Sequence, residues 1–291
     1  MKTIILSTIV ILVTGFIFRN DIGALVAGKP KSENLQKQKK QQQNIGSDVT
    51  IKQKWELPAI LIEVSGIAYI DGQRFACVQD EAGTIFIYNT ATATIEKEIV
   101  FTGPGDFEGI ALNGNTAYIV RSDGVIFEVD MLTKKTTQHA TFLTADNNVE
   151  TLFYDAANKR LLMAGKEPDA IPSFKNIYAF NTVSKTLAKE PVVKIDLAHK
   201  ALATPGNSKK KKKNFMPSAI AVHPQSNDIY ILDGPKSRLL VTGTDGAVKN
   251  VYELGNEFYK PEGISFSPAG DLYISNEGKK IPGNILEVNI R

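Results

Sequence analysis

The chain of 291 residues is poor in the side chains that carry familiar enzyme chemistry. It has a single cysteine, Cys77, and only three histidines, His139, His199 and His223. One cysteine excludes an intramolecular disulfide, and its apolar setting predicts a small buried core residue. The histidines are far apart in the sequence, which disfavours zinc. The sequence also contains no Gly-x-Ser-x-Gly elbow, phosphate loop or dinucleotide-binding turn, so it points to no common catalytic class.

Long apolar runs are equally scarce, and the one that exists stands at the N-terminus. It covers Ile4–Phe18 and is shorter than the roughly 20 apolar residues that span a membrane. Small residues near Ala27 could supply a cleavage site, so residues 1–28 are predicted to be a signal peptide. Arg19 and Asp21 directly follow the run and leave an uncleaved membrane anchor as the alternative. Either segment predicts export, to the periplasm or the extracellular face of a bacterial envelope.

Positive charge is concentrated in two short segments. The formal net charge is +3, but the polar stretch 29–47 and the run Lys209–Lys213 hold most of the excess lysine. The rest of the chain is acidic, so nucleic-acid binding is not predicted. We interpret residues 29–47 as a Lys/Gln-rich linker and residues 197–215 as a lysine-rich surface insertion. Contact of this insertion with an anionic lipid or polymer remains an alternative to a solvated loop.

A repeated strand pattern is the main feature of the sequence. An apolar strand that opens on Ser or Glu recurs five times, and second and third strand patterns follow each start. The intervals are 42 to 44 residues, apart from one of 68. The five starts are Ser65, Glu108, Glu150, Ser218 and Glu262. A repeat of about 40 to 50 residues predicts an all-β protein, a five-bladed β-propeller with six blades as the alternative.

The two ends of the repeat region complement each other. The last repeat ends on its third strand, whereas Val49–Trp55 forms an extra strand pattern before the first repeat. We expect Val49–Trp55 to become the outer strand of the last blade, because this removes two free sheet edges. Residues 48–291 are therefore predicted to form one propeller domain, expected to be a monomer.

The repeat starts also define a candidate site. The first strand of each propeller blade lines the central channel, so Glu108, Glu150 and Glu262 should face each other beside Ser65 and Ser218. Asp106 and Glu63 should extend this acidic cluster by strand alternation. Such a cluster needs a cation, a proton or basic partners. Oxygen ligands favour Ca²⁺, with Mg²⁺ and Mn²⁺ behind it. The alternative is that the glutamates bond to backbone N–H groups of the next blade and hold the ring together.

A second set of polar residues ends the second strands and is expected at one mouth of the channel, where propellers bind ligands. This predicted ligand-binding set comprises Asp80, Glu81, Arg121, Lys166, Asp233, Asn276 and Glu277. Arg121 and Lys166 could recognise an anion or neutralise nearby glutamates. The sequence favours a calcium-binding module for a small molecule or an envelope protein. A Ca²⁺-dependent hydrolase or lactonase is the alternative, and a protein dock without a bound ligand is a third reading.

The series of repeat starts resembles a known family. It comprises Glu63-Val64-Ser65-Gly66, Asp106-Phe107-Glu108-Gly109, Pro217-Ser218 and Pro261-Glu262-Gly263-Ile264, with Gln79-Asp80-Glu81 and Ser275-Asn276-Glu277-Gly278 after second strands. Over residues 50–291 this series resembles the SdiA-regulated (YjiK-like) family of bacterial envelope propellers, distant relatives of NHL-repeat proteins. The resemblance implies a five-bladed propeller with a calcium site and no established enzymatic activity. Glu108, Glu150 and Glu262 fall on the acidic positions of the motif, whereas Ser218 departs from them.

Overall fold

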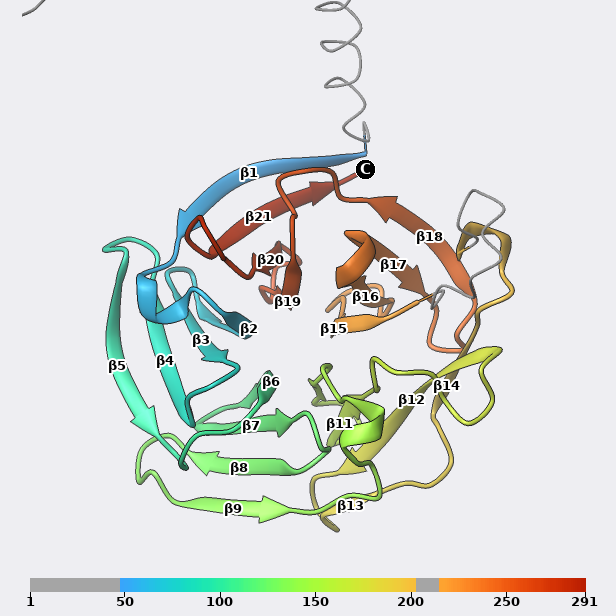
Figure 1. Cartoon of the computed structure of the whole chain (residues 1–291), viewed down its shortest axis with the longest axis horizontal. Coiled ribbons are helices and arrows are strands. Elements are labelled where there is room, and N and C mark those ends of the chain that lie inside the picture. Colours follow the sequence, from blue (N-terminus) through green and yellow to red (C-terminus); the bar gives the residue numbers. More distant parts are fainter. Residues whose placement is uncertain (1–47, 203–214) are drawn as a thin grey trace, which may run out of the picture. The chain divides into compact units, whose positions relative to one another are not determined.

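Five antiparallel β-sheets are arranged around a common centre in the computed structural model (Figure 1). The structure describes residues 48–202 and 215–291. The sheets follow one another in chain order, which confirms the five-bladed propeller and rules out six blades. The predicted signal peptide or anchor (1–28), the linker (29–47) and the run Lys209–Lys213 lie outside the described residues.

Blades 1, 2 and 4 each pair four strands in sequence order from the centre outward. Blade 1 comprises β2 (Val64–Asp71), β3 (Arg74–Gln79), β4 (Thr84–Asn89) and β5 (Thr94–Val100). Blade 2 comprises β6 (Phe107–Asn113), β7 (Thr116–Arg121), β8 (Ile126–Asp130) and β9 (Thr136–His139). Blade 3 comprises β10 (Phe153–Asp155), β11 (Arg160–Met163), β12 (Phe174–Asn181), β13 (Thr186–Leu187) and β14 (Val193–Asp196). Blade 4 comprises β15 (Pro217–Val222), β16 (Ile229–Asp233), β17 (Arg238–Thr242) and β18 (Val248–Glu253).

Blade 5 combines the two ends of the propeller. Its inner strands are β19 (Pro261–Phe266), β20 (Leu272–Asn276) and β21 (Asn284–Ile290), and its outer strand is β1 (Val49–Glu56). Strand β1 runs antiparallel to β21 from the pair Val49–Ile290 to the pair Glu56–Asn284 (Figure 1). The predicted closure by the N-terminal strand is therefore confirmed, and it removes the free edge that β21 would otherwise present.

The long third repeat changes only the periphery of its blade. Strands β13 and β14 both pair with β12 and together replace a single outer strand. The loop before β12 folds over Lys175, whose ammonium group donates to the carbonyls of Gly165 (2.9 Å) and Glu167 (2.6 Å) and lies 3.3 Å from Asp169. Short 3₁₀ turns connect some strands, at Ala59–Leu61, Ala145–Asn147, Lys200–Leu202 and Gly234–Lys236.

The first strands approach one another closely around the axis. A Cβ atom at Gly66 would lie 3.0 Å from the Cα of Gly109, and one at Gly109 would lie 3.0 Å from the Cβ of Leu152. Glycine at these positions therefore lets neighbouring blades pack backbone against backbone. Apolar side chains fill the spaces between adjacent blades, as in the cluster of Ile85, Phe107 and Phe127.

A β-bulge recurs at the repeat starts. In blades 1, 2, 4 and 5 the register between the first two strands shifts by one residue. The extra residues are Ser65, Glu108, Ser218 and Glu262. In blade 3 an isolated bridge between Val149 and Gly165 precedes Glu150, and regular pairing resumes at Phe153. Because a bulge re-aims the side chain of the extra residue, it positions the repeat-start residues at the axis.

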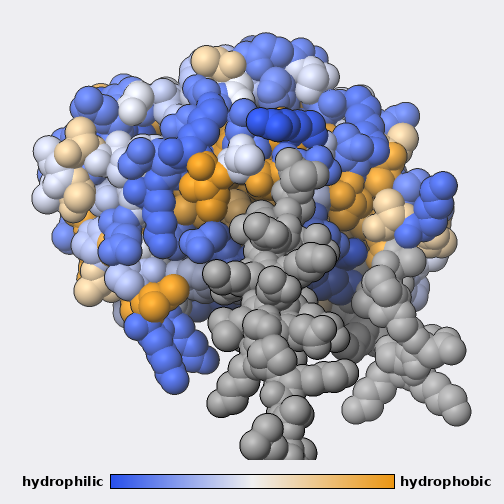
Figure 2. Space-filling model, turned by 90° about the horizontal axis from the view of Figure 1, so that it is seen from above, coloured by the Kyte–Doolittle hydropathy of each residue, from blue (hydrophilic) through white to orange (hydrophobic). Residues whose placement is uncertain are grey.

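The surface seen in Figure 2 is largely hydrophilic, with hydrophobic residues gathered in a few patches. Among residues 48–202 and 215–291, no helix has the length and hydropathy needed to cross a membrane.

Candidate functional site

Three glutamates converge at the end of the propeller axis where the first strands begin. Glu108, Glu150 and Glu262 line a cavity of about 10 Å³, which is enough for roughly one water molecule. Glu150 and Glu262 are 4 % and 7 % exposed. Ionised carboxylates at this depth are costly unless a cation or proton compensates them. We call the three glutamates, together with their neighbours Asn148, Lys166 and Lys260, the acidic mouth.

Glu150 is compensated on one of its two oxygens. Its Oε1 accepts from the Lys166 ammonium group at 2.6 Å and from the Asn148 amide at 2.9 Å. Its Oε2 is buried without a hydrogen-bond partner. Burial raises the pKa of Glu150 and Lys166 opposes that rise. The pKa of Lys166 is itself raised, because attraction to Glu150, Glu262 and Glu108 outweighs the cost of its burial.

Glu262 shares its lysine with a second acid. Lys260 lies 3.5 Å from Glu262 and also contacts Glu277. Burial and the charge of Glu150 raise the pKa of Glu262 to about 7, although Lys166 and Lys260 pull it down. One lysine therefore serves two carboxylates, and Glu262 remains only partly neutralised.

Glu108 has the least compensation of the three. It forms no ion pair within the described parts of the chain, and its acidic neighbours are Glu150, Asp106 and Glu262. Burial, followed by the charges of Glu150, Asp106 and Glu262, raises its pKa to about 9. A hydrogen bond with Asp106 also favours the protonated form of Glu108. Without a bound cation, this side chain is a neutral acid at pH 7.

The two serine repeat starts connect blades. Ser65 donates its hydroxyl to the carbonyl of Phe107 at 2.5 Å, and Ser218 donates to the carbonyl of Pro261 at 2.7 Å. Each bond joins a blade to the backbone of the next one, directly before Glu108 and Glu262. The ring-holding role is the alternative for the glutamates, through backbone N–H groups of the next blade; here the two serines make inter-blade bonds, and they donate to carbonyl groups.

The rim of the mouth is also acidic. Asp80 follows β3, and burial together with Glu63, Glu277 and Glu81 raises its pKa to about 6. Its Oδ1 is buried without a hydrogen-bond partner. Asp80, Glu81 and Asp106 line an open groove of about 560 Å³ between blades 1 and 2. The structure therefore brings Glu63, Asp80, Glu81 and Glu277 together on this rim.

Three residues of the predicted ligand-binding set are engaged elsewhere. Arg121 forms an ion pair with Asp123 at 2.7 Å, so it does not neutralise the glutamates. Asp233, fully buried, pairs with Arg238 at 2.6 Å. Asn276 is buried and donates its side-chain amide to the Asn284 side chain.

Two members of the mouth escaped the sequence prediction. Lys260 directly precedes the fifth repeat start motif, and Asn148 lies two residues before Glu150. Both occupy the repeat position two residues before the repeat start, where blades 1 and 2 have Glu63 and Asp106, so an alignment of the repeats does give a signal for them. A search for basic residues within two positions of each glutamate would have found Lys260.

The donor set can be tested against the predicted calcium ion. Carboxylate oxygens are the ligands that Ca²⁺ prefers, and both Glu108 and the partnerless Oε2 of Glu150 fit that chemistry. In the arrangement seen, no three His, Cys, Asp or Glu side chains of the described residues are close enough together to hold a metal. Lys166 instead supplies the positive charge beside Glu150. The carboxylates are thus suitable ligands for calcium, but their side chains would have to move closer together to bind one ion.

Comparisons with known proteins agree with this fold. No curated protein matches the sequence. Among solved structures, glutaminyl cyclase from Myxococcus xanthus is similar at a TM-score of 0.57 and 15 % identity, over 84 % of this chain and 97 % of that one. A luciferin-regenerating enzyme is similar at 0.51 and 11 % identity, over 78 % and 77 %. At such identities the likeness shows the fold alone.

The family comparison is more specific. The model of the SdiA-regulated family matches residues 40–280, which include all five repeat starts and the whole acidic mouth. The chain therefore belongs to the SdiA-regulated family.

Proposed function

We propose that this propeller is a ligand-binding module of the bacterial envelope whose acidic mouth binds a hard divalent cation, with calcium as the candidate. One observation supports the proposal: the buried Glu150 and Glu262 and the partly buried Glu108 are matched by two lysines, one of which also serves Glu277. The rim adds further acids around Asp80. Clustered negative charge raises the local concentration of cations and favours their binding.

Glu108, Glu150 and Glu262 would hold the cation. They belong to blades 2, 3 and 5, so a shared ion would link three blades across the axis. A cation bound only by the native state must stabilise the fold. The bound ion would also leave the rim groove open to a small molecule or an envelope protein.

The test combines native mass spectrometry with thermal unfolding in Ca²⁺ and in chelator. We expect one bound ion per chain and a higher Tm in Ca²⁺, at calcium concentrations well above Kd. The variant Glu108→Gln should lose most of this increase, whereas Glu98→Gln, on the exposed face of β5, should keep it. No bound ion together with an unmoved Tm would refute the proposal.

A panel of esters and lactones separates a binding module from the hydrolase alternative. We expect no turnover by the calcium-loaded protein. Turnover that disappears in Glu108→Gln would favour a Ca²⁺-dependent hydrolase at the same mouth.

A further inference from the structure

The opposite end of the axis holds two adjoining hollows that the acidic mouth does not use. An axial hollow of about 160 Å³ has a mixed lining, with the apolar side chains of Ile110, Leu152 and Phe266 beside polar groups such as Ser265. A larger pocket of about 650 Å³ opens between blades 1 and 2. Tyr69 and Leu112 line both, so the two hollows adjoin. The larger volume lies within the usual range for small-molecule sites.

Two β-bulges form the wall of the larger pocket. In β2 the register shifts between Tyr69 and Asp71, which makes Ile70 an extra residue. In β5 the register shifts beside Lys97, which makes Glu96 an extra residue. Both extra residues line the pocket. A bulge changes the direction of the side chain of its extra residue, so the two bulges contribute to the irregular shape of this wall.

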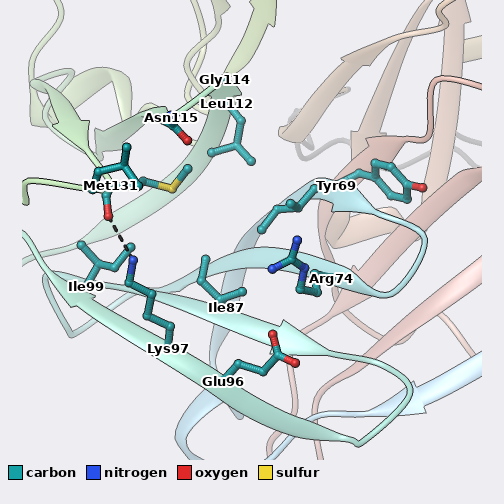
Figure 3. Close-up of a pocket in the computed structure, with 12 residues that line it drawn as sticks. Tyr69, Arg74, Ile87, Glu96, Lys97, Ile99, Leu112, Gly114, Asn115 and Met131 are labelled. Carbon is teal, nitrogen blue, oxygen red and sulfur yellow. Dashed lines mark hydrogen bonds between the residues drawn. The ribbon is translucent and has the colours of Figure 1, made fainter.

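Figure 3 shows side chains of blade 1 facing those of blade 2 across this pocket. Ile87 and Ile99 come from β4 and β5, and Leu112 and Met131 come from the neighbouring blade. Ile87 and Ile99 are buried, whereas Leu112 and Met131 remain partly accessible. The accessible apolar surface therefore comes from Leu112 and Met131 on one side and from the partly accessible Ile70 of blade 1 on the other.

One cation at the pocket lacks an acidic partner. Arg74 is bonded to Asp71 through two of its nitrogens, at 2.8 Å and 2.5 Å. Lys97 instead donates only to the carbonyl of Met131 at 3.2 Å, and within the described residues it forms no ion pair. Its ammonium group keeps further donors free for an anionic group.

We propose that this inter-blade pocket binds a free single-chain amphiphile with a carboxylate head, such as a fatty acid. The chain lies on the apolar side chains that extend toward the axial hollow, and the carboxylate contacts Lys97. This site is independent of the acidic mouth, so neither proposal depends on the other.

The test is calorimetric titration of the full chain with dodecanoate below its micelle concentration, in chelator. We expect saturable one-to-one binding. Lys97→Glu should weaken it about tenfold, as expected for the loss of one charge-assisted contact. Lys194→Glu makes the same charge change on the outer strand β14, outside the pocket, and should leave the affinity unchanged.

Methyl NMR locates the ligand. The Met131 methyl resonance should shift with dodecanoate, whereas that of Met163, buried in blade 3, should not. The proposal is overturned by non-saturable binding, by equal losses in the two lysine variants, or by an unmoved Met131 resonance. Tighter binding of dodecyltrimethylammonium, or binding to phospholipid vesicles without binding of dodecanoate, would also overturn it.

Discussion

The two ends of the propeller axis are built from the same strands, yet they differ in chemistry. Strands β2, β6 and β19 begin near Ser65, Glu108 and Glu262 and end near Tyr69, Leu112 and Phe266. At the beginning of each of these strands a bulge positions a polar residue: Glu108 and Glu262 line the axial cavity, and Ser65 bonds to the backbone of blade 2. At the end, apolar side chains line the hollow. The extra residue of the bulge at the start of a strand thus accounts for the charge at one end of the axis, and the regular part of the same strand supplies apolar side chains to the other end.

Opening the ring of blades should have the largest effect on the free energy of unfolding, and it should disturb both ends of the propeller axis. Deletion of residues 48–56 removes β1 and leaves the outer edge of β21 unpaired along its whole length, although its inner edge stays paired with β20. We expect a loss of more than about 4 kcal/mol of unfolding free energy, beyond the usual range of single substitutions. Thermal unfolding followed by circular dichroism measures this. Thr50→Ser, an exposed change in β1, should leave the curve unchanged; an unchanged curve for the deletion would contradict ring closure.

The pH dependence of stability should separate the two ends, because the carboxyl groups with pKa values raised to about 7 and about 9, Glu262 and Glu108, lie at the acidic mouth. The folded-state pKa values of Glu262 (about 7) and Glu108 (about 9) lie above their ordinary values, so the folded state binds more protons than the unfolded state in this range. Stability in chelator is therefore highest near pH 5 and falls as the pH rises through 7 and 9. We expect Tm to fall by roughly 5–10 °C between pH 6 and 9. A Tm that rises over this interval would refute the claim that Glu108 and Glu262 are only partly neutralised by their neighbours.

Glu108→Gln should remove part of that pH dependence. The amide has nearly the same size as the carboxyl and carries no charge, so in chelator at pH 9 the variant should melt a few degrees above the parent. At pH 4 the difference should nearly vanish, because Glu108 is then protonated in both the folded and the unfolded parent. Glu98→Gln serves as the exposed control. An equal gain at both pH values would assign the effect to packing instead of charge.

Serine substitutions give the smallest effects and compare inter-blade bonds at the two ends. Ser65→Ala and Ser218→Ala each leave a backbone carbonyl at the mouth without its donor. We expect each to cost about 1 kcal/mol, the usual net contribution of one hydrogen bond. Ser265 accepts from the backbone N–H of Tyr69 at the other end (3.0 Å), so Ser265→Ala should cost a similar amount. Urea unfolding measures the change in unfolding free energy for all three variants. A negligible change for Ser65→Ala and Ser218→Ala would show that these serines do not help to hold the blades together.

Periodicity in the sequence was sufficient to predict the blades and the closing strand. Repeat starts such as Glu108 and Glu262 recur at a nearly constant interval, and the pattern of Val49–Trp55 matches the strand missing from the last repeat. The bulges could not be predicted, because an extra residue does not break the apolar pattern of a short strand. The partners of the glutamates were also hidden. Lys166 was expected near them, but Lys260 and Asn148 stand at the repeat position where blades 1 and 2 have the acids Glu63 and Asp106, so a prediction that extended the acidic cluster by strand alternation passed over them.

The location of a bound cation tests the central claim most directly. Crystals grown in Ca²⁺ and measured for anomalous scattering should show one peak at the acidic mouth, within about 2.6 Å of carboxylate oxygens of Glu108, Glu150 and Glu262. Lys166 should then have moved away from Glu150. A mouth without a peak in saturating Ca²⁺, with Lys166 still bonded to Glu150, would contradict the account.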